Sequence, residues 1–306
     1  MRKTAMVRIH QLKNYIWIEA ANPRQAELDR VIDKYQLPEK FKGYMLDRHE
    51  QPRATYDAMT GTGVVVIRAL ASGLDSAITV PIFLGFNDDI IITACHSEEQ
   101  AKLINQQSQT GFSLISDHIF TILKGILGPY FQMLDEVSQR ADNLASHRLT
   151  AITKRRLDSL TILKTRLVYL RSATAGNLVA LEELQGVLRQ RLGMTTDLAR
   201  QVTQQLSDLV VEYRQCQTMF SVQGDVINET EAAYGNLLNN KLNQTMKFLT
   251  VWSLLLAIPP IVSGFYGMNV KLPFADQEAA WFGTIILTIG LMIGMLVIYI
   301  GKNKRH

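Results

Sequence analysis

The chain has 306 residues, enough for a folded soluble part together with a membrane anchor. Its formal net charge of +4 at pH 7 is small for that length, so the charge does not point to a nucleic-acid partner. Two cysteines, Cys95 and Cys216, exclude a disulfide-stapled scaffold and fit a reducing compartment.

Residues 1–96 predict a compact cytoplasmic α/β domain. Alternating apolar and polar residues predict strands at 6–9, 15–18, 63–70, 77–84 and 90–95. A helix is expected over 24–36, with Asn22 as its N-cap and Pro23 in its first turn. The polar stretch 46–53 reads as a connection. No apolar leader precedes the domain, so we expect it to stay in the cytoplasm.

From residue 97 onward the pattern becomes helical. Ser97 is the expected N-cap of a cytoplasmic helical segment over 97–196. Residues 197–266 then predict one long helix, because apolar residues recur every three or four positions without a clear stop signal. This stripe comprises Leu198, Val202, Leu206, Leu209, Tyr213, Cys216, Phe220, Ile227, Thr230, Tyr234 and Leu238.

Two uncharged apolar runs end the chain, Phe248–Tyr266 and Trp281–Ile300. Each has about 20 residues, the length that crosses about 30 Å of hydrocarbon as a helix. A loop over 267–280 separates them, and a basic tail follows over 301–306. The predicted fold is therefore an α+β cytoplasmic domain followed by a long stalk helix and two transmembrane helices, with an all-helical membrane part.

Basic residues flank the two predicted spans on their outer sides in the sequence. Lys241 and Lys247 precede the first span, and Lys302, Lys304 and Arg305 follow the second. Because positive charge favours the cytoplasmic side, we expect a multi-pass protein of the plasma (inner) membrane, in contact with lipid, with both termini in the cytoplasm. Two spans cannot enclose a pore, so a channel of this design requires several copies of the chain.

Enzyme motifs are absent from the sequence, and we expect no catalytic residue. The six histidines are scattered, and neither cysteine has a partner at the spacing of a metal site. The stretch Gly61-Thr62-Gly63 lacks the spacing and the Lys-Ser/Thr pair of a phosphate-binding loop, so no bound nucleotide is expected.

Four asparagines lie within two turns before the first span: Asn236, Asn239, Asn240 and Asn243. In a symmetric bundle each would form a ring of amide oxygens, which suits a hydrated Mg²⁺ ion that gives up water reluctantly. Alternatively, these residues set the register of a helix bundle. On spacing alone the two interpretations have equal weight.

Asn269 follows Gly267 and Met268 where the first span ends, and its carbonyl would lie at the outer mouth of such a pore. As a bare tripeptide, Gly-x-Asn is better explained as a helix C-cap.

The stretch Tyr266-Gly267-Met268-Asn269, followed by a second span and a basic tail, closely resembles the CorA family of magnesium channels. Upstream, 240–250, 167–177 and parts of 17–53 also resemble that family, so the likeness covers essentially the whole chain. The resemblance implies a homopentamer whose stalk helices form the pore. It implies a selectivity filter at Gly267, Met268 and Asn269, and pore-lining positions at Asn243, Met246 and Leu249, with Asn240 one turn earlier.

The resemblance also implies feedback by the transported ion. Asp208 matches a regulatory carboxylate between subunits, where bound Mg²⁺ would hold the ring closed, with a second carboxylate expected near Ser97-Glu98-Glu99. Asp276 and Glu278 in the loop would concentrate cations at the mouth. Two positions depart from the family pattern: Pro260 replaces a pore-facing threonine, and Ala257 replaces a bulkier residue of some relatives.

The sequence therefore predicts a plasma-membrane channel for passive Mg²⁺ influx, gated by cytoplasmic Mg²⁺. One alternative is a transporter of zinc, cobalt or nickel with the same architecture, working in either direction. Another is a membrane-tethered sensor or scaffold, in which the two spans only anchor a signalling stalk.

Overall fold

A computed structural model of the chain describes residues 6–71, 79–108, 112–146, 154–192, 197–268 and 280–303. The chain divides into two compact units, Met1–Glu231 and Ala232–His306. The segments 1–96 and 97–196, which the sequence analysis separates, both lie within the first unit.

A six-stranded mixed sheet forms the centre of the first unit. Its strands are β1 (Met6–Gln11), β2 (Ile16–Ala21), β3 (Arg53–Asp57), β4 (Thr62–Leu70), β5 (Thr79–Phe86) and β6 (Ile90–Cys95). They lie in the order β1-β2-β6-β5-β4-β3, and β2 and β6 are the parallel pair among antiparallel neighbours. Successive residues of β6 are all buried, so both faces of the sheet must be covered.

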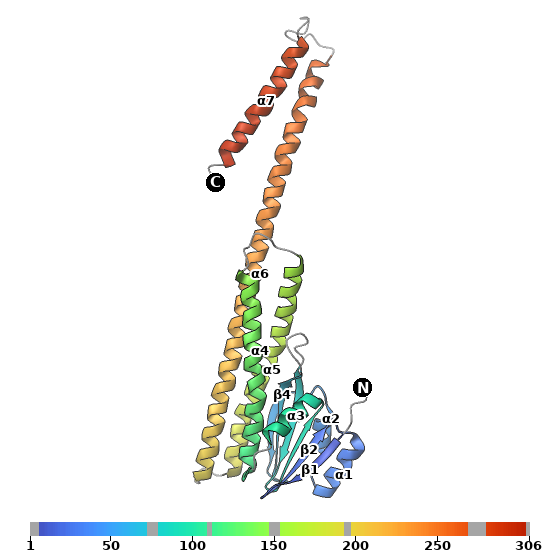
Figure 1. Cartoon of the computed structure of the whole chain (residues 1–306), viewed down its shortest axis with the longest axis vertical. Helices are drawn as coiled ribbons and strands as arrows, with labels where there is room; N and C mark the ends of the chain where they lie inside the picture. The colour runs from blue at the N-terminus through green and yellow to red at the C-terminus, as the bar shows by residue number, and fades with distance from the viewer. Residues whose placement is uncertain are drawn as a thin grey trace. The chain divides into compact units, whose positions relative to one another are not determined.

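Two short helices, α1 (Gln25–Tyr35) and α2 (Lys40–Leu46), cover one face of the sheet (Figure 1). Alternate residues of a strand point to the same face, so Val64 and Val66 of β4 join this core together. The fully buried residues from the two helices include Leu28, Phe41 and Met45.

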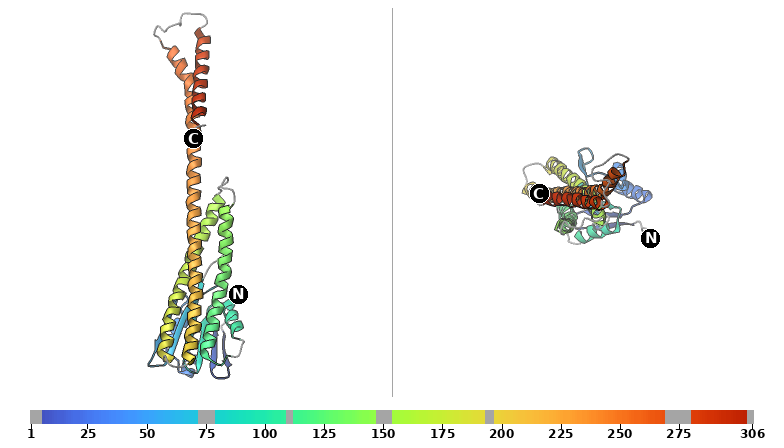
Figure 2. Two further views of the ribbon diagram at one scale, coloured as in Figure 1. Left: turned by 90° about the vertical axis from the view of Figure 1, so that its left-hand side faces the viewer. Right: turned by 90° about the horizontal axis from the view of Figure 1, so that it is seen from above.

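The other face carries α3 (Glu98–Gln107), α4 (Ile115–Ser146) and α5 (Lys154–Leu192), and the first part of α6 (Asp197–Tyr266) lies beside α4 and α5 (Figures 1 and 2). As predicted, Ser97 caps α3, since its hydroxyl accepts the Glu99 N–H at 3.3 Å. The predicted stripe of α6 is buried at Val202, Leu206, Leu209, Tyr213, Cys216, Phe220, Ile227 and Thr230. The amphipathic pattern thus sets which side of α6 faces the other helices.

Some local predictions were wrong. Asn22 does not cap the first helix: it has φ of 47° and its N–H still donates to Cys95 O at 2.8 Å, so it closes β2 instead. Arg24 precedes α1, and its N–H donates to Glu27 Oε2 at 3.1 Å. The polar stretch 46–53 is a connection, as predicted, apart from its two ends: Leu46 closes α2 and Arg53 begins the edge strand β3, two elements that were not predicted.

A buried amide on α5 joins that helix to the sheet. Asn177 Oδ1 accepts the Arg68 N–H at 2.7 Å, and Asn177 Nδ2 donates to Arg68 O at 2.8 Å. Tyr130 of α4 donates to the same carbonyl at 2.7 Å. One residue of β4 is therefore hydrogen-bonded by both covering helices, and Asn177 and Tyr130 are fully buried.

Replacement of Asn177 by leucine is expected to lower the free energy of unfolding of the first unit by about 2–4 kcal/mol, because it leaves a buried backbone N–H without an acceptor. The thermal midpoint of the purified full-length protein measures this. Asn228→Leu is the matched control, since Asn228 is exposed on α6. Equal midpoints for the two variants would contradict the assigned role of Asn177.

His118 on α4 is completely buried against the sheet. Its Nδ1 lies 3.0 Å from Tyr15 Oη and its Nε2 lies 2.7 Å from Ser108 Oγ, while the rings of Phe112 and Trp17 pack around it. Burial, aided by the nearby His10, lowers the pKa of His118 to about 4. The imidazole is therefore neutral in the folded protein near pH 7.

We expect acid to destabilise the first unit through His118. The unfolded chain binds this proton with a pKa of about 6.5 and the folded chain only near 4, so stability is lost as the pH falls from about 6.5 towards 4. At pH 5 the loss is about 2 kcal/mol. Thermal midpoints at pH 7 and pH 5 test this, and His118→Gln should shrink the difference between them. If the midpoints of His118→Gln at pH 7 and pH 5 differed as much as those of the wild type, the acid sensitivity would arise from groups other than His118.

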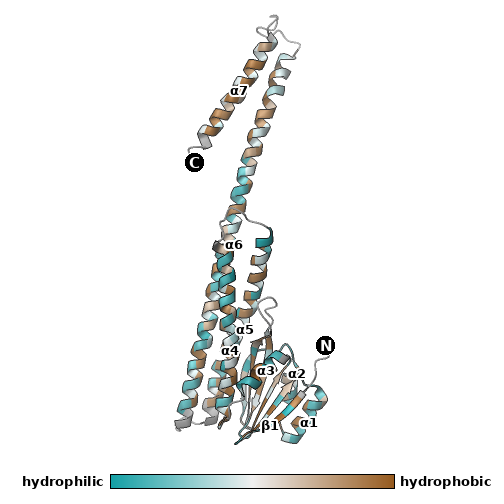
Figure 3. Ribbon diagram, in the orientation of Figure 1, coloured by the Kyte–Doolittle hydropathy of each residue, from teal (hydrophilic) through white to brown (hydrophobic). Residues whose placement is uncertain are grey.

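The second unit contains the end of α6 and helix α7 (Ala280–Asn303). Both helices hold an 18-residue window apolar enough to cross a membrane, and only 11% and 0% of these windows are buried within the chain. Figure 3 shows the apolar colour concentrated in these parts. Low burial distinguishes them from core helices of a soluble protein, and the protein therefore has two candidate membrane spans.

One face of α6 in this unit is covered, although the helix is otherwise exposed. Leu255 and Val262 are only 5% and 7% exposed. On α7 a half-buried row recurs every three or four residues: Thr284, Thr288, Met292, Met295 and Tyr299. We infer that these two rows face each other. Helix α6 continues through Pro259 and Pro260, although neither proline can donate to a carbonyl one turn earlier.

Candidate ion pathway and carboxylate cleft

The residues predicted to line a pore lie on the side of α6 that is turned away from the covered face. An α-helix rotates by about 100° per residue, so Met246 lies about 180° from Leu255, and Asn243 and Leu249 lie about 120° to either side of Leu255. Met246 and Leu249 are 66% and 62% exposed. Asn243, Met246 and Leu249 thus form one arc centred opposite Leu255, which we call the free face.

Asn240 does not belong to the free face. It lies only about 60° from Leu255, on the side towards α7. A cavity of about 740 Å³ lies there between α6 and α7, and Asn240 lines it together with Asn243, Met246 and Tyr299. Asn243 and Met246 therefore border both this cavity and the free face, whereas Leu249 does not line the cavity.

Towards the end of the span, the free face continues with a proline and a glycine. Pro260 and Gly264 lie about 140° and 180° from Leu255. Neither has a long side chain, and Ser263 donates its hydroxyl to Pro260 O at 3.2 Å. Position 260 therefore brings no side-chain hydroxyl and no backbone N–H to the free face.

Helix α6 ends just before the predicted filter. The Gly267 N–H donates to Ser263 O at 2.9 Å, and the Met268 N–H donates to Phe265 O at 3.4 Å. A Cβ at position 267 would lie 3.2 Å from Ser263 O, which explains why glycine suits this final turn. Asn269, Asp276 and Glu278 lie outside the described residues.

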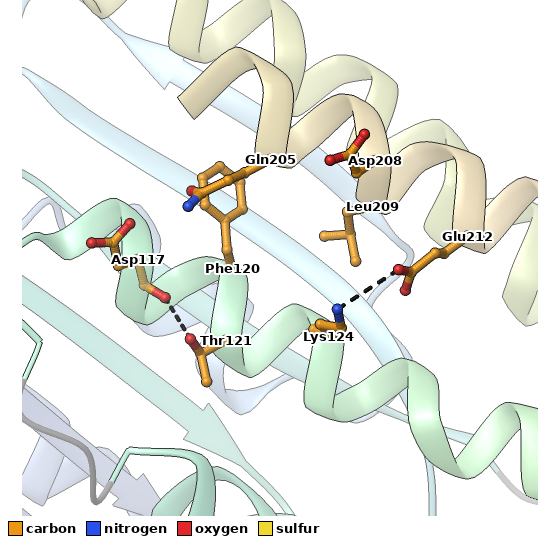
Figure 4. Close-up of a pocket in the computed structure, with 8 residues that line it drawn as sticks. All are labelled: Asp117, Phe120, Thr121, Lys124, Gln205, Asp208, Leu209 and Glu212. Carbon is orange, nitrogen blue, oxygen red and sulfur yellow. Dashed lines mark hydrogen bonds and ion pairs between the residues drawn. The ribbon is translucent and has the colours of Figure 1, made fainter. Parts of the chain in front are cut away.

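Asp208, the predicted regulatory carboxylate, is exposed and lies in a cleft of about 290 Å³ between α4 and α6 (Figure 4). Asp117 of α4 and Glu212 of α6 line the same cleft. Lys124 of α4 does so too, and its Nζ lies 3.7 Å from Glu212 Oε1. The cleft therefore contains three carboxylates and one ammonium group.

Within one chain, this carboxylate cleft does not supply a complete set of ligands for a metal ion. Among the residues that the structure describes, no three His, Cys, Asp or Glu side chains converge to hold a metal ion. Its net negative charge attracts cations, but Lys124 neutralises part of it. A divalent ion at Asp208 would consequently require further ligands from water or from another copy of the chain.

Sequence reasoning named Asp208 as a candidate but not its neighbours in the cleft, Asp117 and Lys124. These two residues lie on α4, about 90 positions earlier in the chain, and only the packing of α4 beside α6 brings them together. Glu99, near the carboxylate expected around residue 98, lines a different cavity of about 330 Å³ with Glu136.

The chain is similar to known proteins over most of its length. The model of the CorA-like Mg²⁺ transporter protein family matches residues 13–302. A curated relative, the Cobalt/magnesium transport protein CorA of Methanocaldococcus jannaschii, is 23% identical over 300 residues, covering 94% of this chain and 90% of that protein. The protein of the same name from Thermotoga maritima is 23% identical over 191 residues, covering 61% of this chain and 51% of that protein.

Solved structures show the same fold. The complete structure of the CorA magnesium transporter from Methanocaldococcus jannaschii aligns with a TM-score of 0.77 at 23% identity, covering 93% of this chain and 90% of that one. The full-length CmaX protein aligns with a TM-score of 0.70 at 15% identity, covering 95% of this chain and 90% of that one. The predicted fold, a soluble α/β part followed by a long helix and a second apolar helix, is confirmed.

The family match extends over both units, and the two candidate spans lie at the C-terminal end of the matched residues. The chain is thus a membrane protein and not an enzyme: it belongs to the CorA-like family of divalent-cation transporters.

Proposed function

We propose that the protein is a homo-oligomeric channel that conducts Mg²⁺ passively into the cell. The observation that carries this proposal is the free face of α6, on which an amide and two exposed apolar side chains lie away from the covered residues Leu255 and Val262. A lone anchor has no need of such an arrangement. The cation is proposed from the family description and from the names of the two curated relatives, which pair magnesium with cobalt.

The free face requires neighbours. In one chain the apolar residues Met246 and Leu249 are mostly exposed, and two spans cannot enclose a pore. Copies of α6 arranged around an axis would bury this face and close a ring. We propose five copies, the number that the family resemblance implies.

The chemistry of the pore follows from the order of residues along α6. A ring of Asn243 amides would hold the water shell of Mg²⁺ by neutral hydrogen bonds, because this ion gives up water reluctantly. Rings of Met246 and Leu249 would form an apolar constriction that closes by excluding water. At the opposite end, Gly267, Met268 and Asn269 would form the filter, and Asp276 and Glu278 would raise the local cation concentration.

The direction of flux follows from the membrane potential. With both termini in the cytoplasm of a cell whose plasma membrane is negative inside, the potential favours entry by about 2.3 kcal/mol per charge for each 100 mV, and twice that for Mg²⁺. Cytoplasmic Mg²⁺ bound at Asp208 would oppose further entry by holding the subunits together. The exposed position of Asp208 leaves room for ligands from a neighbouring copy.

Co²⁺ is the second proposed cargo, since both curated relatives are named for cobalt as well as magnesium. Oxygen ligands from Asn side chains favour the harder Mg²⁺ ion. Competition between the two ions during uptake into proteoliposomes would rank them. Stronger uptake of Co²⁺ at equal concentrations would reverse the order proposed here.

Cysteine accessibility tests the proposed pore. Cys95 and Cys216 are buried, and burial raises the pKa of each thiol to about 12, so neither reacts readily with a charged thiol reagent. Met246→Cys and Leu249→Cys are expected to be modified by such a reagent, with block of Mg²⁺ uptake. Leu255→Cys, on the face covered by α7, is the control that should not be blocked. If the reagent blocked Mg²⁺ uptake only in Leu255→Cys, the face around Leu255, and not the free face, would line the pore.

A further inference from the structure

The two apolar helices of the second unit leave a cavity at one end of their contact. Around Leu255 and Val262 the covered face of α6 is closed. Towards the start of the apolar run a cavity of about 740 Å³ separates α6 from Tyr299, near the C-terminal end of α7. We call this cavity the wedge.

The wedge is lined by groups that donate hydrogen bonds to anions. Lys247 is the one charged residue in its lining, and no ion pair of Lys247 occurs within the described residues. Asn243 and Gln244 add amide N–H groups, and Tyr299 adds a phenol from the opposite wall. Thr250 contributes an acceptor instead, since its hydroxyl donates to Met246 O at 2.8 Å.

The wedge is apolar on the side that continues into the span. Val251 and Met246 belong to its lining. Phe248 and Trp252, which do not line the wedge, are 57% and 51% exposed at the same level of α6, with ring centroids 5.9 Å apart. Lysine next to aromatic residues at the end of an apolar run is typical of the membrane interface. An occupant must therefore have an anionic head and an apolar tail.

We propose that the wedge binds an anionic phospholipid of the cytoplasmic leaflet. Lys247 and Tyr299 hold the phosphate from opposite walls, Gln244 donates to its oxygens, and the acyl chains leave along Val251 into the bilayer. Basic pockets between transmembrane helices on the cytoplasmic side suit such headgroups. The assignment of the leaflet rests on the orientation proposed above, whereas the binding itself does not depend on ion conduction.

Native mass spectrometry of the purified full-length protein tests this, with dioleoyl phosphatidylglycerol or dioleoyl phosphatidylcholine added in detergent. The wild type is expected to retain phosphatidylglycerol in preference. Lys247→Gln should retain about fivefold less, and Tyr299→Phe should also retain less. Lys241→Gln is the matched control, because Lys241 lies six positions earlier on the same helix and does not line the wedge.

Three results would overturn the proposal. Equal losses for Lys241→Gln and Lys247→Gln would show attraction to the general basic surface. Displacement of the lipid by glycerol 1-phosphate at similar concentrations would show a site for small anions. Absence of retained lipid in the wild-type oligomer would show that a neighbouring subunit fills the wedge. The lipid count is read without any ion flux, so a failure here leaves the proposed transport activity unaffected.

Discussion

Replacing Asn243 by leucine is expected to lower Mg²⁺ uptake into proteoliposomes about tenfold or more. On the free face, a ring of Asn243 amide oxygens would accept hydrogen bonds from the water around the passing ion. Loss of one neutral hydrogen bond costs about 0.5–1.5 kcal/mol, a ring loses several of them together, and 1.4 kcal/mol corresponds to a factor of ten. A leucine ring would also extend the apolar constriction of Met246 and Leu249, which further disfavours water.

Asn240→Leu is the matched control for this substitution. Asn240 has the same side chain one turn earlier and lines the wedge as Asn243 does, but it lies about 60° from Leu255 instead of about 120° and so does not belong to the free face. We expect it to keep most of the uptake. Equal loss in Asn240→Leu and Asn243→Leu would show that the two faces of α6 do not differ in function. Normal uptake in both variants would favour the membrane-tethered scaffold, for which aligned amides are unnecessary.

Replacing Asp208 by asparagine is expected to weaken closure by internal Mg²⁺. If the ion bound at Asp208 holds the subunits together, removal of this charge weakens its binding by about tenfold, the effect of one lost charge-assisted contact. Uptake into vesicles preloaded with millimolar Mg²⁺ should then continue in Asp208→Asn, whereas it slows in the wild type. Uptake into empty vesicles should be similar in both.

Asp225→Asn controls for the general effect of removing a charge from α6, because Asp225 is also exposed there and does not line the carboxylate cleft. Uptake by Asp225→Asn should slow in vesicles preloaded with Mg²⁺, as uptake by the wild type does. If internal Mg²⁺ slows uptake by Asp208→Asn as much as it slows uptake by the wild type, Asp208 has no part in feedback. In that case Asp117 and Glu212, the remaining carboxylates of the cleft, would be tested next. Either would be assigned to feedback only if its own substitution abolished the slowing by internal Mg²⁺.

The sequence predicted the elements whose patterns are strong and local. Strand β6 was predicted at its observed bounds, Ile90–Cys95, because a run of buried apolar residues follows a polar turn. Helix α6 was predicted over its full length because its apolar stripe has no break. Strand β3 was missed because an edge strand carries polar residues and follows Pro52. Helix α2 was missed because it is short and contains Gly43.

The candidate site could be proposed from the sequence where one helix supplies it. The sequence shows the spacing of Asn243, Met246 and Leu249 along α6. It does not show which way these residues face, because that depends on which side of α6 packs against α7. For the same reason Asn240 could not be separated from Asn243. Lys124, which pairs with Glu212, required the packing of α4 against α6, a contact between residues about 90 positions apart.

The most direct test of the central claim is Mg²⁺ uptake into proteoliposomes, followed with a fluorescent indicator, for the wild type and for Asn269→Ala. We predict rapid uptake by the wild type under an inside-negative potential, and loss of uptake in the variant with oligomer assembly intact. Equal uptake by both would leave transport in place and remove Asn269 from the filter. No Mg²⁺ uptake by the wild type, with Co²⁺, Ni²⁺ or Zn²⁺ entering instead, would contradict the proposal of a magnesium channel.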